Sequence, residues 1–198
     1  MKSLLAVLMI GMMVFSVSFV FAEETELTPS QTRWFLMKKT VGFGTGFFAG
    51  FVGHELGHSV VAEIEDVDIT WSGSDWRTHT EKKSEVRNIS LGGFAEQILS
   101  SEIILGCDKI PKDNAFVLGY MAWNIINPII YTLKNETRSG GHGDLKTIDK
   151  SGLNSEYVEL VIVGHALLSA YRLYKKPEFP FFIKATHQEL IIGLAWRW

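Results

Sequence analysis

The sequence predicts a mainly α-helical fold with one small β-hairpin or sheet. The chain contains several long apolar segments and one short stretch in which apolar and polar residues alternate. Three apolar segments approach the length of a membrane-spanning helix, residues 40–62, 115–133 and 157–174. Each also carries polar residues typical of a buried core helix, so soluble-core and membrane-embedded helices both remain open. Between the first two segments, Val67, Ile69 and Trp71 alternate with Asp68 and Thr70, which predicts a short strand.

Glycines, prolines and polar clusters divide the rest of the chain into further elements. In chain order we expect a turn at residues 72–75, a return strand at 86–90, helices at 94–105 and 115–133, a glycine-rich loop at 134–143, and helices at 145–150 and 153–174. The last helix should end before Pro177. Six glycines within residues 40–62 indicate a helix that packs closely on its neighbours.

The first 22 residues resemble a bacterial-type secretory signal. Lys2 supplies a positive charge, residues 4–20 are apolar, and Ala22 precedes a polar stretch that begins at Glu23. The apolar run is also just long enough to serve as an uncleaved membrane anchor. Both interpretations predict an exported protein of the cell envelope, either periplasmic or associated with the membrane. Residues 23–39 would then be a linker, and residues 40–198 one domain.

Composition restricts the kinds of site that this chain can build. The 198 residues are 46% hydrophobic and 21% charged, which is sufficient for one domain with a sizeable core. The net charge of −3 shows no basic excess, so we expect no nucleic-acid partner. Because Cys107 is the single cysteine, the chain can form neither an internal disulfide nor a Cys-based zinc site. Any metal must therefore be held by His, Asp or Glu.

The segment His54-Glu55-Leu56-Gly57-His58 is the strongest functional signal in the sequence. Residues four apart share one face of an α-helix, so both imidazoles can reach one zinc ion. Glu55 lies beside the first histidine, where its carboxylate can take a proton from a zinc-activated water and return it to the leaving amine. A carboxylate and two imidazoles are costly to bury in an apolar helix unless something satisfies them, and a metal ion does so.

A catalytic zinc needs a third protein ligand and an open position. Several residues are candidates for that ligand: Asp144, His142, Glu96, His165, His79 and His187. Asp144 follows the glycines of Gly140-Gly141-His142-Gly143, which would let this loop approach a helix closely. The alternative is that Asp144 only caps the short helix that follows it.

Residues 54–149 resemble the peptidase domain of the AAA membrane-anchored zinc proteases. The counterparts here are the HELGH segment, then Leu91-Gly92-Gly93-Phe94-Ala95-Glu96-Gln97-Ile98-Leu99, then Ser139-Gly140-Gly141-His142-Gly143-Asp144-Leu145-Lys146. This resemblance implies a zincin-like helical metallopeptidase in which Asp144 is the third ligand. It also implies that Glu96 orients a ligand histidine. The chain departs from that family in having no ATPase domain or P-loop.

The long apolar segment with Asn127-Pro128 is similar instead to the intramembrane site-2 proteases, which place an Asp ligand on a helix after the HExxH helix. Asn127 could bind substrate backbone or bridge helices. His142 could stabilise the oxyanion or be an ordinary loop histidine. His165 could touch the metal site or be a satisfied core residue.

The sequence therefore predicts a zinc-dependent endopeptidase that acts on protein or peptide substrates, with His54, His58 and Asp144 as ligands and Glu55 as general base. Two alternatives remain open. One is a non-catalytic membrane or envelope protein with a structural zinc, and the other is a structural protein without a metal. The sequence says nothing of oligomeric state.

Overall fold

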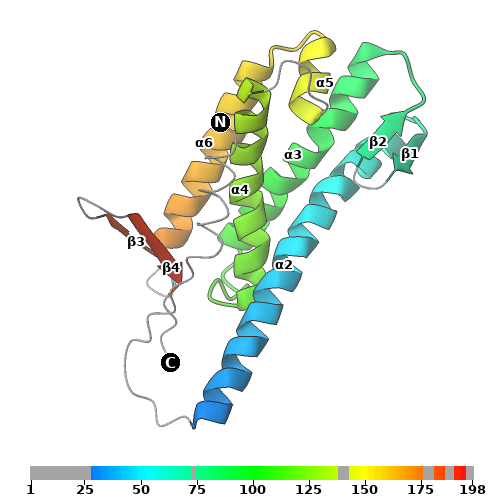
Figure 1. The fold of residues 1–198 in the computed structure, drawn as a ribbon. Coiled ribbons are helices and arrows are strands. Elements are labelled where there is room, and N and C mark those ends of the chain that lie inside the picture. The colour runs from blue at the N-terminus through cyan, green and yellow to red at the C-terminus, as the bar shows by residue number, and fades with distance from the viewer. Residues whose placement is uncertain (1–27, 73–74, 138–142, 176–180, 186–189, 195–198) are drawn as a thin grey trace.

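The computed structural model describes residues 28–72, 75–137, 143–175, 181–185 and 190–194. These residues form the following elements (Figure 1): α2 (Pro29–Ile64), β1 (Ile69–Ser72), β2 (Asp75–Thr78), α3 (Lys83–Gly106), α4 (Ala115–Thr137), α5 (Asp144–Lys150), α6 (Ser155–Tyr174), β3 (Phe181–Ala185) and β4 (Leu190–Leu194). The expected mainly α-helical fold with a small hairpin is confirmed. The predicted signal, at residues 1–22, lies outside the described residues.

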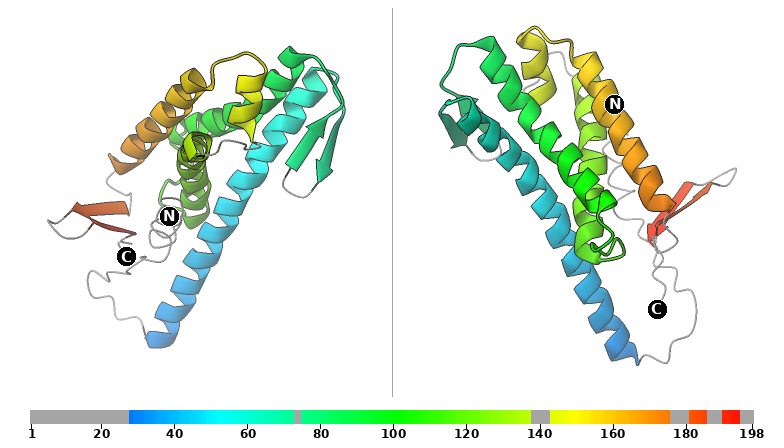
Figure 2. Two further views of the ribbon diagram at one scale, coloured as in Figure 1. Left: turned by 45° about the horizontal axis from the view of Figure 1, so that its top comes forward. Right: turned by 180° about the vertical axis from the view of Figure 1, so that it is seen from behind.

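The long helices pack side by side along much of their length. Helix α2 lies against both α3 and α4, and α4 also lies against α6. Seen from the front and from behind, the C-terminal end of α2, the start of α3, α5 and the β1–β2 hairpin gather at one end of the molecule (Figures 1 and 2). That end carries the histidines of the HELGH segment.

Helix α2 begins at Pro29, well before the start that we expect at residue 40. Thr28 caps it: the Thr28 backbone N–H donates to Oε1 of Gln31 at 2.9 Å, and the Gln31 backbone N–H donates to the Thr28 hydroxyl at 3.4 Å. A proline at the first helical position suits this start, because its missing N–H would have no partner there anyway. Residues 29–39, which we expected in a linker, therefore extend the helix.

The predicted return strand at residues 86–90 is wrong, because these residues lie inside α3. The strand that pairs with β1 is β2, and the two form an antiparallel hairpin in which Trp71 faces Trp76. From Ile89 onward, the buried residues of α3 follow a helical period: Ile89, Ser90, Gly92, Gly93, Phe94, Gln97, Ser101 and Leu105. A five-residue window was too short to distinguish this period from that of a strand.

Glycines bring the backbone of α2 into direct contact with its neighbours. A Cβ added at Gly46 would lie 1.9 Å from the carbonyl oxygen of Phe116 in α4. Gly57 of α2 and Gly92 of α3 face one another in the same way, and a Cβ added at either would lie 2.5 Å from the other's carbonyl oxygen. The close packing that we expected from the glycines of α2 is therefore confirmed, and it fixes His54 and His58 against α3.

Two buried apolar clusters hold the helices together. One joins α3, α5 and α6 through Phe94, Leu145, Ile148 and Ile162, and the other consists of Leu105, Met121 and Leu173. The first cluster anchors the start of α5 beside α2. Among the described residues one helical segment, Ala115–Asn135, is long and apolar enough to cross a membrane, with a mean hydropathy of 1.3. The core helix of a soluble protein meets the same criterion, so this is weak evidence for a membrane.

Candidate metal centre

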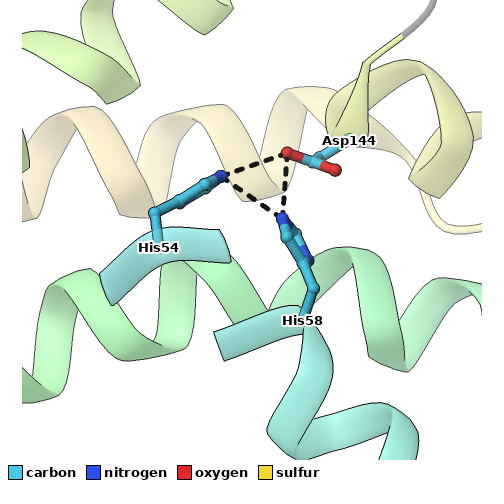
Figure 3. A group of neighbouring side chains, drawn as sticks. All are labelled: His54, His58 and Asp144. Carbon is cyan, nitrogen blue, oxygen red and sulfur yellow. Dashed lines mark hydrogen bonds and ion pairs between the residues drawn. The ribbon is translucent and has the colours of Figure 1, made fainter. Parts of the chain in front are cut away.

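Side chains from two elements far apart in sequence point toward one another (Figure 3). His54 and His58 project from successive turns of α2, and Asp144 is the first residue of α5. The Nε2 atoms of the two histidines are 3.3 Å apart. Oδ2 of Asp144 lies 3.3 Å from Nε2 of His54 and 3.5 Å from Nε2 of His58. In the part of the chain that the structure describes, this is the one such group of potential ligands.

These separations suit a tetrahedral metal ion. Zinc binds imidazole nitrogen and carboxylate oxygen at about 2.0–2.2 Å, so neighbouring ligand atoms of a tetrahedral site lie about 3.3–3.6 Å apart. The three distances of 3.3, 3.3 and 3.5 Å among His54, His58 and Asp144 are close to that edge length. The three residues could therefore occupy three corners of a tetrahedron and leave the fourth open.

The hydrogen-bond partner of Nδ1 in each ring indicates which ring nitrogen carries the hydrogen. Nδ1 of His58 is 2.7 Å from the carbonyl oxygen of Ile89, and Nδ1 of His54 is 3.2 Å from Oε1 of Gln97. A backbone carbonyl oxygen accepts hydrogen bonds and cannot donate them, so Nδ1 of His58 carries a hydrogen. With the Gln97 amide turned so that Oε1 faces the ring, Nδ1 of His54 carries a hydrogen as well. In the neutral rings Nε2 then presents a lone pair, and both lone pairs face the Asp144 carboxylate.

Three acceptors in one buried place require a cation. His54 and His58 are each 1% exposed and Asp144 is 4% exposed. Burial opposes ionisation of Asp144, but once the rings carry a second proton, on Nε2, hydrogen bonds from His54 and His58 hold the pKa of the Asp144 carboxyl well below its usual range. Burial also works against a charge on His58, but Asp144, the Ile89 carbonyl and Glu55 together raise the pKa of His58 above its ordinary value. The centre therefore attracts positive charge, and a proton or a metal ion can supply it.

Gly93 makes room for the two rings. A Cβ at this position would lie 2.5 Å from Cε1 of His54 and 2.7 Å from Nε2 of His58. Aromatic rings enclose the histidines on other sides. The ring centroid of Trp76 lies 5.0 Å from that of His58, and the centroids of Phe94 and Tyr131 lie 5.5 and 5.9 Å from that of His54. These walls keep the centre apolar and strengthen its electrostatic interactions.

Glu55 lies on α2 between the two histidines in sequence and is half-buried. Its charge is close enough to contribute to the raised pKa of His58. The carboxylate is thus near the centre without belonging to the group that could hold the metal. The role of general base for Glu55 stays a prediction.

The remaining candidate residues lie apart from this group of three. Oε1 of Glu96 accepts a hydrogen bond from the Tyr120 hydroxyl at 2.6 Å. His165 lies 3.0 Å from a carboxylate oxygen of Glu102, and His79 hydrogen-bonds to Thr70. None of these three residues belongs to the described group of potential ligands. His142 and His187 lie outside the described residues.

The contact to a ligand histidine that we expected from Glu96 is made by its neighbour, Gln97. Asn127 donates from Nδ2 to the same Gln97 oxygen at 3.3 Å, so it bridges α4 to the centre. Sequence reasoning missed Gln97, Trp76 and Tyr131. Gln97 could have been found as the amide on the buried, otherwise small or apolar face of α3, four residues after Gly93. Trp76 and Tyr131 carry no sequence signal that separates them from core aromatics.

No protein-family model, curated protein or solved structure matches this chain. The resemblance to zinc protease families therefore stays a prediction, and no family is identified. The structure itself shows a helical protein with a buried group of two histidines and one aspartate that could hold a metal ion.

Proposed function

We propose that this protein is a zinc-dependent metallopeptidase in which His54, His58 and Asp144 hold the metal and Glu55 is the general base. The observation that carries this proposal is the separation of the three ligand atoms, 3.3–3.5 Å, on the frame of an HExxH helix. Zinc, when bound, supplies a Lewis acid that lowers the pKa of a water from about 15.7 toward 7. Three protein ligands rather than four are typical of a catalytic zinc site.

The protein side chains then handle the protons. Glu55 accepts a proton from the water that attacks the peptide carbonyl, and it delivers this proton to the nitrogen of the leaving amine. The hydrogen bonds of Nδ1 to Ile89 and Gln97 hold both imidazoles with Nε2 toward the metal position. The substrate under this proposal is a protein or peptide chain.

The deep burial of His54, His58 and Asp144 favours a second candidate function, a non-catalytic envelope protein with a structural zinc. Structural zinc sites are closed and have four protein ligands. His142 is the nearest histidine in sequence to Asp144 and is a candidate for such a fourth ligand. The two functions differ in whether the zinc-bound protein has a peptidase activity that depends on the Glu55 carboxylate.

We also propose that the protein resides in the cell envelope in contact with a membrane. The predicted signal at residues 1–22 supports export. Large apolar side chains are exposed along α2 at helical spacing and along α6, and a lipid surface would cover them. They are Trp34, Met37, Val41, Phe48, Val52, Leu56, Val60 and Ile64 on α2, and Tyr157, Leu160, Val161, Leu167, Leu168, Tyr171 and Tyr174 on α6.

The metal content and the peptidase activity of matched variants test the catalytic proposal. The full chain is purified in detergent as wild type, Glu55→Gln, His58→Ala, Asp144→Asn and Glu63→Gln, the last a control at an exposed carboxylate of the same helix. We expect one zinc per wild-type chain, and loss of zinc in the His58 and Asp144 variants. Glu55→Gln should keep its zinc and lose activity by about 10²–10⁴-fold or more, whereas Glu63→Gln should behave as wild type.

Two results would overturn the catalytic proposal. A Glu55→Gln protein as active as wild type would exclude Glu55 as the base. A wild type that binds one zinc but cleaves no unfolded protein substrate would favour the structural-zinc function.

A further inference from the structure

Gln97 connects the candidate metal centre to α4 by hydrogen bonds. Its Oε1 lies 3.2 Å from Nδ1 of His54 and 3.3 Å from Nδ2 of Asn127. Gln97 is 3% exposed and Asn127 is 4% exposed, so no bulk water competes for these contacts. Asn124 adds a second tie, because its Nδ2 donates to the Gln97 backbone carbonyl at 3.2 Å. Helix α4 thus holds both the backbone and the side chain of Gln97.

A carboxamide can face its neighbours in two ways, and only one of them suits a metal at His54. With Oε1 toward the ring, as the structure has it, His54 carries its hydrogen on Nδ1 and presents a lone pair at Nε2. If the amide turned over, its NH₂ group would donate to Nδ1. The ring hydrogen would then sit on Nε2 and point at the metal position, where it would block ligation.

We propose that Gln97 is a positioning residue that sets the metal-binding tautomer of His54, and that Asn127 holds the Gln97 amide in the required orientation. The inference rests on the proposed metal site. Asn127 fulfils this role because its NH₂ group donates, so that the oxygen of Gln97 is the group that must face it. Two donors, Nδ1–H of His54 and Nδ2–H of Asn127, then converge on one acceptor.

Two nearly isosteric substitutions separate positioning from electrostatics. In Gln97→Glu the new carboxylate can only accept, so the required tautomer of His54 is kept, and zinc should bind at least as tightly as to wild type. In Asn127→Asp the new carboxylate accepts from the Gln97 NH₂ group and turns the amide over. Zinc affinity should then fall by about 10–100-fold, the usual effect of losing an outer partner of a ligand histidine.

Each of these variants adds one negative charge near the centre, and a purely electrostatic role predicts tighter zinc binding in both. The opposite response of the two variants is therefore the signature of positioning. Gln97→Leu removes the acceptor altogether and should also weaken zinc binding by about 10–100-fold. Asn135→Ser is the matched control on the same helix, since Asn135 bonds to Ser155 and Glu159 and not to Gln97.

The measurement is a zinc titration of the full chain in detergent against a chromophoric chelator, with imidazole ¹⁵N NMR to identify the tautomer of His54 in the metal-free protein. We expect the Nδ1–H form in wild type, Gln97→Glu and Asn135→Ser, and its loss in Asn127→Asp. Thermal melts of the metal-free variants show whether each one folds. Should Gln97→Leu fail to fold, the comparison of Gln97→Glu with Asn127→Asp still distinguishes a positioning role of Gln97 from a purely electrostatic one.

Tighter binding in both charged variants, or an Asn127→Asp protein with wild-type affinity and tautomer, would overturn the role of Gln97 and leave the metal site intact. A wild type that binds no zinc would overturn the proposed function and this inference together. The two failures are therefore distinguishable.

Discussion

At the scale of single residues, Gly93 sets how closely α3 can approach the two histidines. We expect Gly93→Ala to abolish zinc binding, because the new methyl group would lie 2.5–2.7 Å from ring atoms of His54 and His58 and would force them apart. Gly164→Ala is the control, since nothing lies within 4 Å of a Cβ at that helical position. It should keep its zinc and gain about 0.5–1 kcal/mol of stability. Zinc analysis measures the metal content of both variants, and chemical denaturation measures their free energy of unfolding. Zinc retained in Gly93→Ala would mean that the rings can move without loss of the site.

His58 and Asp144 also predict how the stability of the metal-free protein depends on pH. The pKa of Asp144 is lowered from 3.8, so its contribution is present above that value and is lost as pH falls through the folded-state pKa. The pKa of His58 is raised from 6.5, so its contribution is complete below 6.5 and is lost as pH rises through the folded-state pKa. The pair should therefore contribute most between about pH 4 and pH 6.5.

Zinc should change this dependence, because it competes with the proton on His58. With zinc present we expect the free energy of unfolding to rise from pH 5 to above pH 7, whereas the metal-free protein loses the contribution of His58 above about pH 6.5. Denaturant titrations across this range, with zinc and with a chelator, measure the difference. Two parallel curves would show that metal and proton do not share the site.

At the scale of elements, the crossing of α2 and α4 depends on backbone contact. A methyl group at Gly46 would lie 1.9 Å from the Phe116 carbonyl oxygen, and one at Gly119 would lie 2.0 Å from that of Phe43. Backbone cannot rotate away as a side chain can, so we expect Gly46→Ala to lower the free energy of unfolding by about 1–3 kcal/mol. Gly44→Ala, on the same helix with nothing within 4 Å, should instead raise it by about 0.5–1 kcal/mol. Equal effects of the two substitutions in denaturant titrations would contradict this packing.

At the scale of the whole molecule, the exposed apolar side chains predict where the protein is found. We expect it in the membrane fraction, retained through an alkaline carbonate wash and released by detergent. Val52→Glu with Leu56→Lys places two charges on the exposed face of α2 and should increase release by carbonate without unfolding the helix. Glu63→Lys, at an exposed charged position of the same helix, should have no effect. Full release of the wild type by carbonate would exclude the proposed contact with lipid.

Much of this molecule could be predicted because the relevant signals are local. The helices at 115–133, 145–150 and 153–174 follow from apolar length and periodicity, and the structure has helices there. The face shared by His54 and His58 follows from the pitch of an α-helix. The two misplaced boundaries, at Pro29 and at residues 86–90, concern short segments in which capping or tertiary burial outweighs a weak local pattern.

Local sequence patterns are sufficient to predict the mainly helical fold, the paired histidines and the chemistry that such a pair can support. The identity of the carboxylate that joins the histidines depends on tertiary packing, since Asp144 lies 90 residues beyond His54 in the chain and meets it through the packing of α5. The tertiary structure also placed Gln97, rather than Glu96, against His54. These two neighbours differ by about 100° around α3, and only the contact with α2 fixes which of them faces the histidine. Helical periodicity depends on residues that are close in the sequence, whereas contact between distant side chains depends on how closely whole helices can pack.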